Sequence, residues 1–434
     1  MQYWLSAFRP RMVTLSRAAL AVGLVSAVPG VALAQERSSK LEAEKETPPA
    51  LEPVGARIGV FRAFVGGDLA AVYDDNVYAR ETAKVDDTYF KISPRARLVS
   101  DTSRYKFTFS AGLDRYEYSK QDSESRTDWN AQSDIVAELL RDTNVTFNVG
   151  FRHATEERGA PDSPTTARSP VRYDSFTAGG GLSREVGRLQ LRTIVDYEKL
   201  DYRDGRLGNG VAINNDDRDR QYIAGGGEWS YEFSPGYRVY GRALFDRTAY
   251  KNPLDDSNFN RDAKGYRLTG GVKFEITNLV DGSIFGGYMR HNYKDPRFQD
   301  YKGAAYGANI RWSPTRLTTV YFDANRTVQE TTLNGFRGYV STSLGVRAEH
   351  DLTRFVQVNG GVRYDKNKYL RIAGFVPAPV ARDDDLFTAN LGLKYTFSRQ
   401  FSLGAVWDYT KRSTNAVASD YTRNKASVVL RLTF

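Results

Sequence analysis

Residues 425–434, KASVVLRLTF, alternate between polar and apolar side chains up to the last residue of the chain. One face of this segment would carry Ala426, Val428, Leu430, Leu432 and Phe434. The other face would carry Lys425, Ser427, Arg431 and Thr433. Successive side chains of a β-strand point to opposite faces, so this period of two predicts a strand with one apolar and one polar face.

The same alternation recurs from about residue 57 to residue 434, and its apolar faces are often interrupted by Gly or Ala. A soluble β-sandwich needs bulky inner faces to fill its core, whereas a face turned toward lipid needs no such complementarity. The chain also combines 27 Tyr and 37 Gly with a mean hydropathy of −0.52. We therefore predict a transmembrane β-barrel, in which lipid-facing and water-facing residues alternate. The outward residues would include Phe107, Phe147, Val362, Leu391, Leu430 and Leu432, and the inward ones Arg95, Arg97, Asn148, Lys394 and Arg431.

Short turn signals alternate with longer polar segments along this region. The short turns fall at 101–102, 141–142, 186–187, 235–236, 279–280, 314–315, 352–353 and 399–400. The long segments are 74–86, 119–126, 154–171, 201–217, 251–262, 293–300, 329–336, 366–384 and 411–421. Short turns at one rim and long loops at the other are typical of antiparallel up-and-down outer-membrane barrels, whose short rim lies in the periplasm. Eight turns and nine loops predict about 18 strands, or 16 if two weak pairs are misread, with both termini periplasmic.

The predicted strands can be given as residue ranges, with boundaries good to a few residues. They are 59–73, 88–100, 105–118, 126–140, 143–153, 172–185, 188–200, 218–233, 237–250, 263–277, 280–292, 301–313, 317–328, 337–351, 355–365, 385–398, 401–410 and 422–434.

The chain begins with the parts of a secretory signal peptide, residues 1–34. Arg9, Arg11 and Arg17 precede or open a short apolar run, and Ala32-Leu33-Ala34 forms a small-residue cleavage site. Residues 35–56 are charged, hold Pro48, Pro49 and Pro53 and lack periodicity, which predicts a flexible periplasmic linker before the barrel at 57–434. The absence of Cys excludes disulfides and thiolate sites.

Charge excludes one class of partner and predicts two walls inside the barrel. Removing the three signal-peptide arginines lowers the formal net charge from +9 to +6, a small excess that gives no reason to expect nucleic acid. Parity places a basic wall at Arg62, Lys91, Arg95, Arg97, Lys106, Arg363, Lys394, Lys425 and Arg431. An acidic wall would hold Asp128, Asp134, Glu138, Glu228 and Glu232. The walls could set a field across a wet lumen, or their charges could form pair ladders between neighbouring strands.

Catalytic, cofactor and metal sites find little support. The three His are His153 and His291, expected near the outer rim, and His350, expected near the periplasmic one. No nucleophile motif or paired catalytic spacing accompanies them, so a rim hydrolase is only a distant alternative. Acidic runs such as Asp74-Asp75 and 383–385 in the outer loops have no ordered metal-ligand spacing. We assign no enzyme activity, cofactor or metal.

Two segments carry resemblances. The end Val428-x-Leu430-x-Leu432-x-Phe434 resembles the C-terminal signal that the barrel-assembly machinery reads in bacterial outer-membrane proteins. Residues 73–78, YDDNVY, followed by 90–94, FKISP, resemble the β-barrel porin family often linked to exopolysaccharide biosynthesis gene clusters. This second resemblance implies an outer-membrane barrel of a Gram-negative bacterium that could serve polysaccharide secretion. It supplies no site residues.

These patterns together predict a channel for hydrophilic solutes or secreted polysaccharide, because barrels of this size leave an aqueous lumen. A structural or adhesive surface barrel with a plugged lumen is the alternative. The expected partners are outer-membrane lipid and lipopolysaccharide, the assembly machinery and polysaccharide-export components.

Loops 154–171 and 366–384 are long enough to fold inward. Aromatic girdles are expected at Tyr105, Phe233, Tyr237, Trp312, Phe397, Phe401 and Phe434 on the periplasmic side, and at Tyr89, Trp129, Tyr197, Tyr364 and Trp407 on the outer side.

Overall fold

The computed structural model describes residues 53–100, 102, 104–163, 166–277, 279–376, 379–417 and 419–434. The predicted signal peptide (1–34) and most of the predicted linker (35–56) lie outside the described residues.

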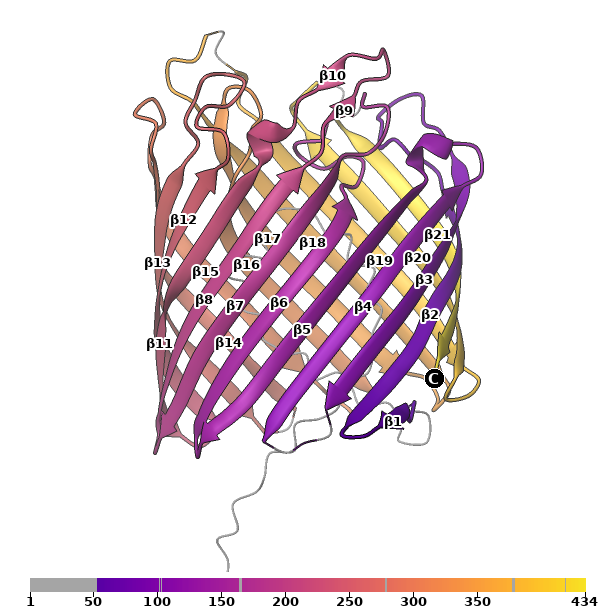
Figure 1. The fold of residues 1–434 in the computed structure, drawn as a ribbon, viewed down its shortest axis with the longest axis vertical. Helices are drawn as coiled ribbons and strands as arrows, with labels where there is room; N and C mark the ends of the chain where they lie inside the picture. The colour runs from indigo at the N-terminus through magenta and orange to yellow at the C-terminus, as the bar shows by residue number, and fades with distance from the viewer. Residues whose placement is uncertain are drawn as a thin grey trace, which may run out of the picture.

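The described chain forms one closed antiparallel barrel (Figure 1). Its strands are β2 (Phe61–Asp74), β3 (Asp87–Ser100), β4 (Tyr105–Tyr118), β5 (Arg126–Leu140), β6 (Thr143–Thr155), β7 (Arg172–Val186), β8 (Leu189–Tyr202), β11 (Arg220–Ser234), β12 (Tyr237–Tyr250), β13 (Ala263–Ile276), β14 (Val280–Tyr293), β15 (Tyr301–Trp312), β16 (Thr318–Gln329), β17 (Phe336–Asp351), β18 (Val356–Arg371), β19 (Asp383–Thr396), β20 (Phe401–Thr414) and β21 (Tyr421–Thr433). Each strand pairs with the next along the chain, and β21 pairs with β2 to close the ring. The predicted count of 18 strands is confirmed.

Strand boundaries agree with the predicted ranges to within about two residues, with two clear exceptions. β18 continues to Arg371 instead of ending at 365, and β20 continues to Thr414 instead of 410. Both extensions are held by neighbouring strands, since Lys368 pairs with Asp383 and Arg412 with Leu386. The polar residues that predicted loops at these two places therefore belong to strands that continue beyond the apolar band of the wall.

Five short elements among the described residues were not predicted. β1 (Ala56–Ile58) pairs with β2, so the segment read as the end of the linker and the start of the barrel forms a small hairpin. β9 (Gly205–Arg206) and β10 (Ala212–Ile213) form a second hairpin in the loop after β8. The 3₁₀ turn η3 (Asp216–Arg218) lies in the same loop, and the 3₁₀ turn η2 (Asp122–Glu124) lies in the loop between β4 and β5. Elements of two or three residues are too short to show a period.

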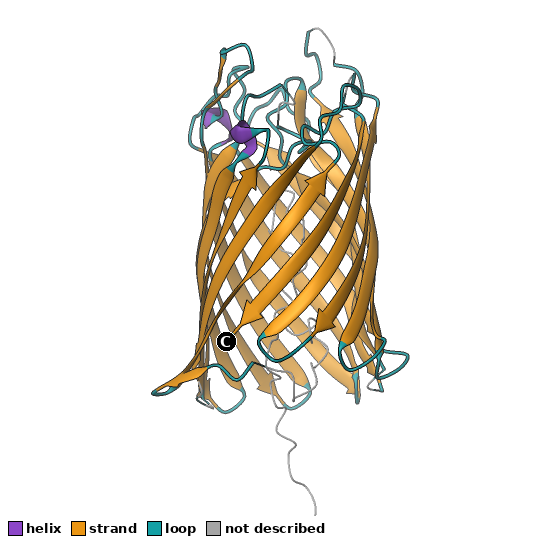
Figure 2. Ribbon diagram, turned by 90° about the vertical axis from the view of Figure 1, so that its right-hand side faces the viewer, coloured by secondary structure: helices purple, strands orange, loops and turns teal. Residues whose placement is uncertain are grey.

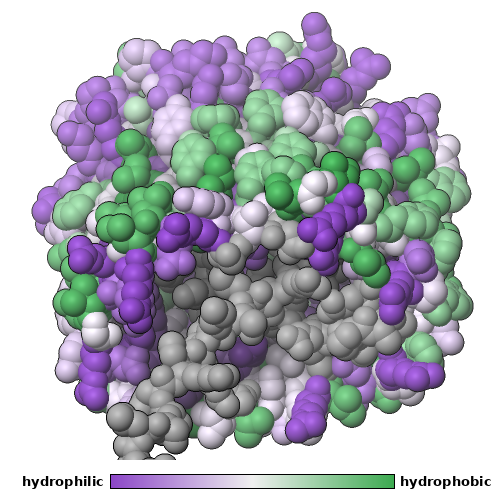
Figure 3. Space-filling model, turned by 60° about the horizontal axis from the view of Figure 1, so that its bottom comes forward, coloured by the Kyte–Doolittle hydropathy of each residue, from purple (hydrophilic) through white to green (hydrophobic). Residues whose placement is uncertain are grey.

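The long connections gather at one end of the barrel, here called the loop end, and the short turns at the other, the turn end (Figure 2). The C-terminus and β1 both lie at the turn end (Figure 1). Space-filling shows hydrophobic side chains spread over the wall and hydrophilic ones gathered at the far, loop-bearing end (Figure 3). Within the described residues no helix has the length and apolar character needed to cross a membrane.

Side chains alternate between the two faces of the wall. Phe147, Val362 and Leu391 are exposed on the outer face, and Leu430 lies opposite the exposed Leu69 and Leu403. Arg431, one residue further, forms an ion pair with Asp68 on the other face. This is the register predicted from the alternation, which a shift of one residue would invert.

Most of the predicted girdle residues lie exposed on the outer face. Those exposed are Tyr105, Phe233, Trp312, Phe397, Phe401 and Phe434 toward the turn end, and Trp129, Tyr364 and Trp407 toward the loop end. Tyr89 is a correction: it is buried, stacked on Tyr118 with 4.5 Å between ring centroids. Tyr89 shares its face with Lys91, two residues further along β3, and the exposed aromatic residue at this level is Phe90.

Candidate functional site

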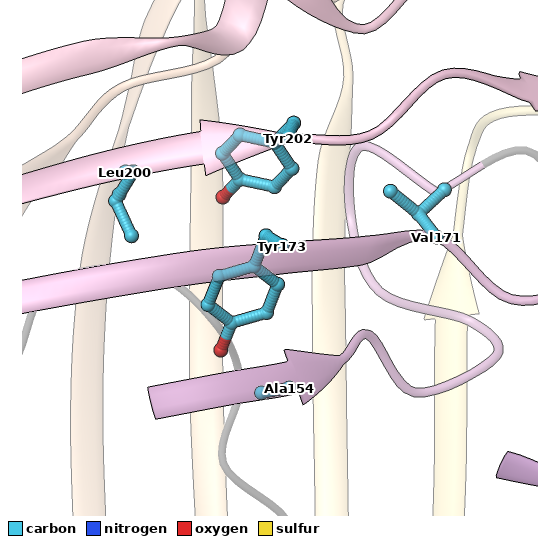
Figure 4. Packing of buried hydrophobic residues seen from close by; sticks show 5 residues of the cluster. All are labelled: Ala154, Val171, Tyr173, Leu200 and Tyr202. Atoms are coloured by element: carbon cyan, nitrogen blue, oxygen red, sulfur yellow. The ribbon is translucent and has the colours of Figure 1, made fainter. Parts of the chain in front are cut away.

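The inner side of the barrel near the loop end carries a layer of buried tyrosines, of which only Tyr89 was predicted to lie in a girdle. They are Tyr89, Tyr118, Tyr173, Tyr202, Tyr293, Tyr339, Tyr369 and Tyr421. Figure 4 shows Tyr173 and Tyr202 side by side on β7 and β8, with Leu200, Ala154 and Val171 beside them. The two rings stack with 5.3 Å between centroids. In an open barrel these inward rings would be exposed to water. Their burial therefore requires that loop residues, such as Val171, pack against them.

One covering segment is the loop between β6 and β7, which the structure describes at residues 156–163 and 166–171. It reaches strands far from its own. Four strands, β5, β4, β3 and β2, separate β6 from β21 in the barrel order. Yet Arg412 of β20 donates a hydrogen bond to the Gly159 carbonyl (3.0 Å), and Thr331, between β16 and β17, donates to Asp162 (2.5 Å). The loop therefore extends across the mouth of the barrel.

Glu157 fixes the middle of this crossing. Its carboxylate lies 3.4 Å from Lys425 Nζ, 3.4 Å from Arg423 Nη1 and 3.6 Å from Arg126 Nη2. Lys425, with help from Arg423 and Arg126, holds the pKa of Glu157 well below its usual range despite burial. Glu157 is therefore ionised at any physiological pH, and the loop is tied to the β21 wall by charge.

Two further ion pairs hold the base of the same loop. Arg158 donates to Glu124 of η2 (Nη2 to Oε1, 2.6 Å) and to the Ala167 carbonyl (2.8 Å). Glu156 pairs with Arg218 of η3, and burial raises the pKa of Glu156 against the opposing effect of Arg218. Each pair joins this loop to a different neighbouring loop, so the mouth is one connected network.

The YDDNVY segment sits where the barrel closes. Asp74 is 0% exposed and accepts hydrogen bonds from Arg423 Nε at 3.0 Å. Asp75 accepts from both the backbone and the side chain of Asn424, each at 2.7 Å. Asn76 donates to the Thr422 carbonyl at 2.9 Å. The acidic motif thus joins the first barrel strand to the last at the loop end.

The residues of the predicted basic wall are largely paired with acids. Lys91 and Arg95 each lie 3.3 Å from Asp114, and Arg431 lies 2.8 Å from Asp68. Arg363 contacts Asp365 (3.0 Å) and Asp323 (3.2 Å), and Lys425 contacts Glu157. Arg62, Arg97, Lys106 and Lys394 occupy β2, β3, β4 and β19 on the same face parity. Pair ladders between neighbouring strands therefore account for much of this wall.

The predicted acidic wall behaves in the same way. Glu228 is bound by Arg242 and by Lys273 (2.5 Å), and Glu232 by Arg238 (2.8 Å). Asp128 accepts from Thr155 (2.7 Å) and lies 3.9 Å from Arg126, while Asp134 accepts from Gln132 (2.9 Å). Glu138 lies on β5 opposite Asn144. That a basic wall faces an acidic wall across the lumen remains a prediction. The contacts show that many of the acidic residues are paired with nearby basic residues.

Each histidine meets a polar neighbour. His153 Nδ1 lies 2.6 Å from Asp174, His291 Nε2 lies 3.0 Å from Glu330, and His350 lies 2.9 Å from Thr318 Oγ1. Within the described ranges, no group of three or more His, Cys, Asp or Glu residues is arranged to hold a metal ion. The acidic runs are instead bound to arginines and backbone amides, as with Asp384, which contacts Arg382 and Arg412.

Asp217 makes one neighbouring loop sensitive to pH. Burial, then repulsion from Asp256, raises its pKa from 3.8 to about 6. A raised carboxyl pKa means that the folded loop is favoured below pH 3.8 and loses stability as the pH rises through about 6. We expect hydrogen exchange in residues 203–219, corrected for its intrinsic pH dependence, to rise roughly tenfold across this range. Asp217→Asn should remove most of the change, whereas Asp201→Asn should retain it; a flat wild-type profile would contradict the assignment.

Sequence reasoning missed the residues that build the mouth. Arg126 and Arg423 lie on predicted strands, at or beside their ends, and have inward parity, so the alternation could have found them. Glu156, Glu157 and Arg158 lie in a segment without periodicity, and no signal in the sequence connects them to strands on other sides of the barrel.

Comparisons with known proteins give one matching family and several similar solved structures. The family model described as "Putative beta-barrel porin 2" matches residues 48–434. Among solved structures, a BenF-like porin from Pseudomonas fluorescens Pf-5 is similar at 10% identity and a TM-score of 0.46, covering 87% of this chain and 100% of that one. OccAB4 of Acinetobacter baumannii is similar at 12% identity and a TM-score of 0.45, covering 86% and 98%. The siderophore receptor PirA from Pseudomonas aeruginosa is similar at 9% identity and a TM-score of 0.46, covering 87% of this chain and 82% of that one. No curated protein matches the sequence.

Proposed function

Because this chain belongs to the putative beta-barrel porin 2 family and has a porin-like outer-membrane fold, we propose that it is a channel for hydrophilic solutes or secreted polysaccharide, constricted at the loop end by residues 156–171. In this proposal the loop end faces the outside and both termini lie in the periplasm, as short turns at the periplasmic rim imply.

The observation that supports passage is an 18-strand barrel with inward ion pairs both near the turn end, as with Arg311 and Asp281, and at the loop end, as with Arg423 and Asp74. Barrels of about this strand number are too wide for side chains of the wall to fill. Ion pairs such as Arg363 with Asp323 and Arg311 with Asp281 leave charges only partly buried, which suits a wet interior. The constriction then decides which solutes pass.

A second candidate is a structural barrel that is closed at the loop end. The stacked tyrosines and the ion pairs of Glu157 favour it, because together they pack the mouth closely. The two candidates differ in one measurable quantity, the current through a folded barrel.

The partners follow the same proposal. The assembly machinery would read Val428, Leu430, Leu432 and Phe434 on β21. If the cargo is a polysaccharide, export components in the periplasm would deliver it to the turn end.

The test is single-channel recording of the purified, refolded full chain in planar lipid bilayers. The channel proposal expects discrete conductance steps. A folded barrel, verified by heat-modifiable migration on a gel, that produces no steps would favour the structural barrel.

Ion selectivity provides a prediction about the basic wall. Arg95→Glu with Arg97→Glu reverses two inward charges on β3, so we expect the reversal potential in a salt gradient to shift toward cations, by a severalfold change in permeability ratio. Arg141→Glu with Arg188→Glu makes the same charge change in exposed short turns and should shift it little. Equal shifts in both variants would show that the selectivity does not depend on the β3 wall.

A further inference from the structure

The outer face of β12 to β15 carries a cluster of basic side chains near the loop end. Arg247, Lys264 and Lys302 are exposed, and Arg290 is half-buried beside them. Their chain neighbours Thr248, Gly265 and His291 are buried, which places the four cations on the opposite, membrane-facing side. The four strands lie side by side in the wall (Figure 1).

The strand register brings like charges together. Arg247 lies directly opposite Lys264, and Arg290 directly opposite Lys302. Lys264 and Arg290 are diagonal neighbours, since Tyr266 pairs with Arg290. Side chains directly opposite each other are about 5 Å apart at Cβ, and like charges in that position destabilise a sheet. This arrangement is unfavourable unless an anion lies between them.

Among the described residues, only one acidic residue forms an ion pair with a member of this cluster. Arg290 donates to Asp300 at 2.9 Å, while Arg247, Lys264 and Lys302 form no ion pair among the described residues. The equivalent positions on β18 and β19 are arranged differently. There Lys366 lies opposite Asp385, and Lys368 opposite Asp383. The uncompensated charge at β12 to β15 is therefore not shared by β18 and β19.

The height of the cluster matches a headgroup layer. Phe245, Tyr266 and Tyr288 each lie two residues from a member of the cluster, on the same face and toward the middle of the wall. Two residues correspond to about 6.6 Å along a strand. Aromatic rings prefer the interface of the hydrocarbon region, so the cations sit just beyond it, among the charged groups of the lipids.

We infer that Arg247, Lys264, Arg290 and Lys302 form a binding site for the phosphate groups of lipopolysaccharide. The inference rests on the proposed orientation, with the loop end in the outer leaflet, but not on conduction through the lumen. Two guanidinium groups can each bind a phosphate through two parallel hydrogen bonds, and two ammonium groups add charge at short range. A bound phosphate would offset the repulsion within both like-charged pairs.

The test uses the full chain, folded in detergent, and deep-rough lipopolysaccharide as the probe, with the bound lipid measured by native mass spectrometry. Wild type is expected to retain it. Arg247→Gln/Lys264→Gln/Lys302→Gln should weaken binding roughly a hundredfold, and Lys264→Gln alone about fivefold. The single variant keeps the test decisive if the triple variant does not fold.

The control is Lys366→Gln/Lys368→Gln/Lys411→Gln, which removes the same charge from two exposed positions and one half-buried position at the same rim and should bind as wild type does. Dephosphorylated lipopolysaccharide should bind weakly to every form. The inference is overturned if the Arg247 triple variant binds as wild type does, if dephosphorylation has no effect, or if phosphatidylglycerol binds as tightly as lipopolysaccharide. The last result would point to a general contact with anionic lipid.

Discussion

Replacing residues 157–170 by a short Gly-Ser turn is expected to raise the single-channel conductance severalfold. β6 and β7 are neighbours, and adjacent antiparallel strands need only two to about five residues to connect. The replacement would remove the contacts of Glu157 with Lys425 and Arg423 and that of Gly159 with Arg412, all of which cross the mouth. None of the described pairings between barrel strands includes residues 157–170, so the barrel should still close.

The matched control shortens the exposed segment 80–84, in the loop after β2, which lies at the same end of the barrel. Its conductance should equal that of the wild type. A loop-replaced barrel that folds and conducts no better than wild type would place the constriction elsewhere than in residues 156–171.

Arg423→Met should cost about 3–5 kcal/mol of unfolding free energy, the range found when one partner of a buried ion pair is removed. Asp74 is fully buried, and Arg423 Nε donates a hydrogen bond to each of its two carboxylate oxygens at 3.0 Å. Without the guanidinium, that carboxylate stays buried and keeps the hydrogen bond from the Asn76 backbone amide at 3.1 Å and the longer-range charge of Lys425 on the opposite strand. Urea unfolding in lipid vesicles, followed by tryptophan fluorescence, would measure the loss.

Two companion variants separate pairing from packing. Arg423→Met with Asp74→Asn removes the unpaired charge and should recover part of the loss. Arg115→Met breaks the exposed pair with Glu117 and should cost less than about 1 kcal/mol. If Arg423→Met and Arg115→Met were equally mild, the contact between Arg423 and Asp74 would contribute little to stability.

The strands could be predicted closely because each is an independent local pattern. In KASVVLRLTF the hydrophobic effect alone selects the face, and turn residues such as Gly187 and Gly236, both at positive φ, end the strands. The extension of β18 to Arg371 could not be predicted from that pattern, because beyond the apolar band both faces meet water. There the period disappears while the backbone ladder continues.

The mouth was beyond prediction for a different reason. Its loop was identified as long enough to fold inward, but where it lands depends on side chains from β5, β20 and β21, which only the closed barrel brings together. The location of a tyrosine is also ambiguous, because its ring suits both an outer girdle and a stacked position inside the barrel. Tyr89 was placed in a girdle by its chemistry, although its parity with Lys91 put it inside, where stacking on Tyr118 satisfies the same ring.

The seam between β2 and β21 bears on how long the folded protein lasts. Asp75 and Asn424 are 349 residues apart in sequence, so their contact closes almost the longest loop that the chain can form. The entropic cost of such a closure grows with loop length and must be met before any seam contact forms, which makes it a late step in folding. Interactions made after the transition state slow unfolding instead of speeding folding. The acidic motif and Arg423 would therefore act chiefly on the rate at which the ring reopens, and the persistence of the barrel would be a kinetic property.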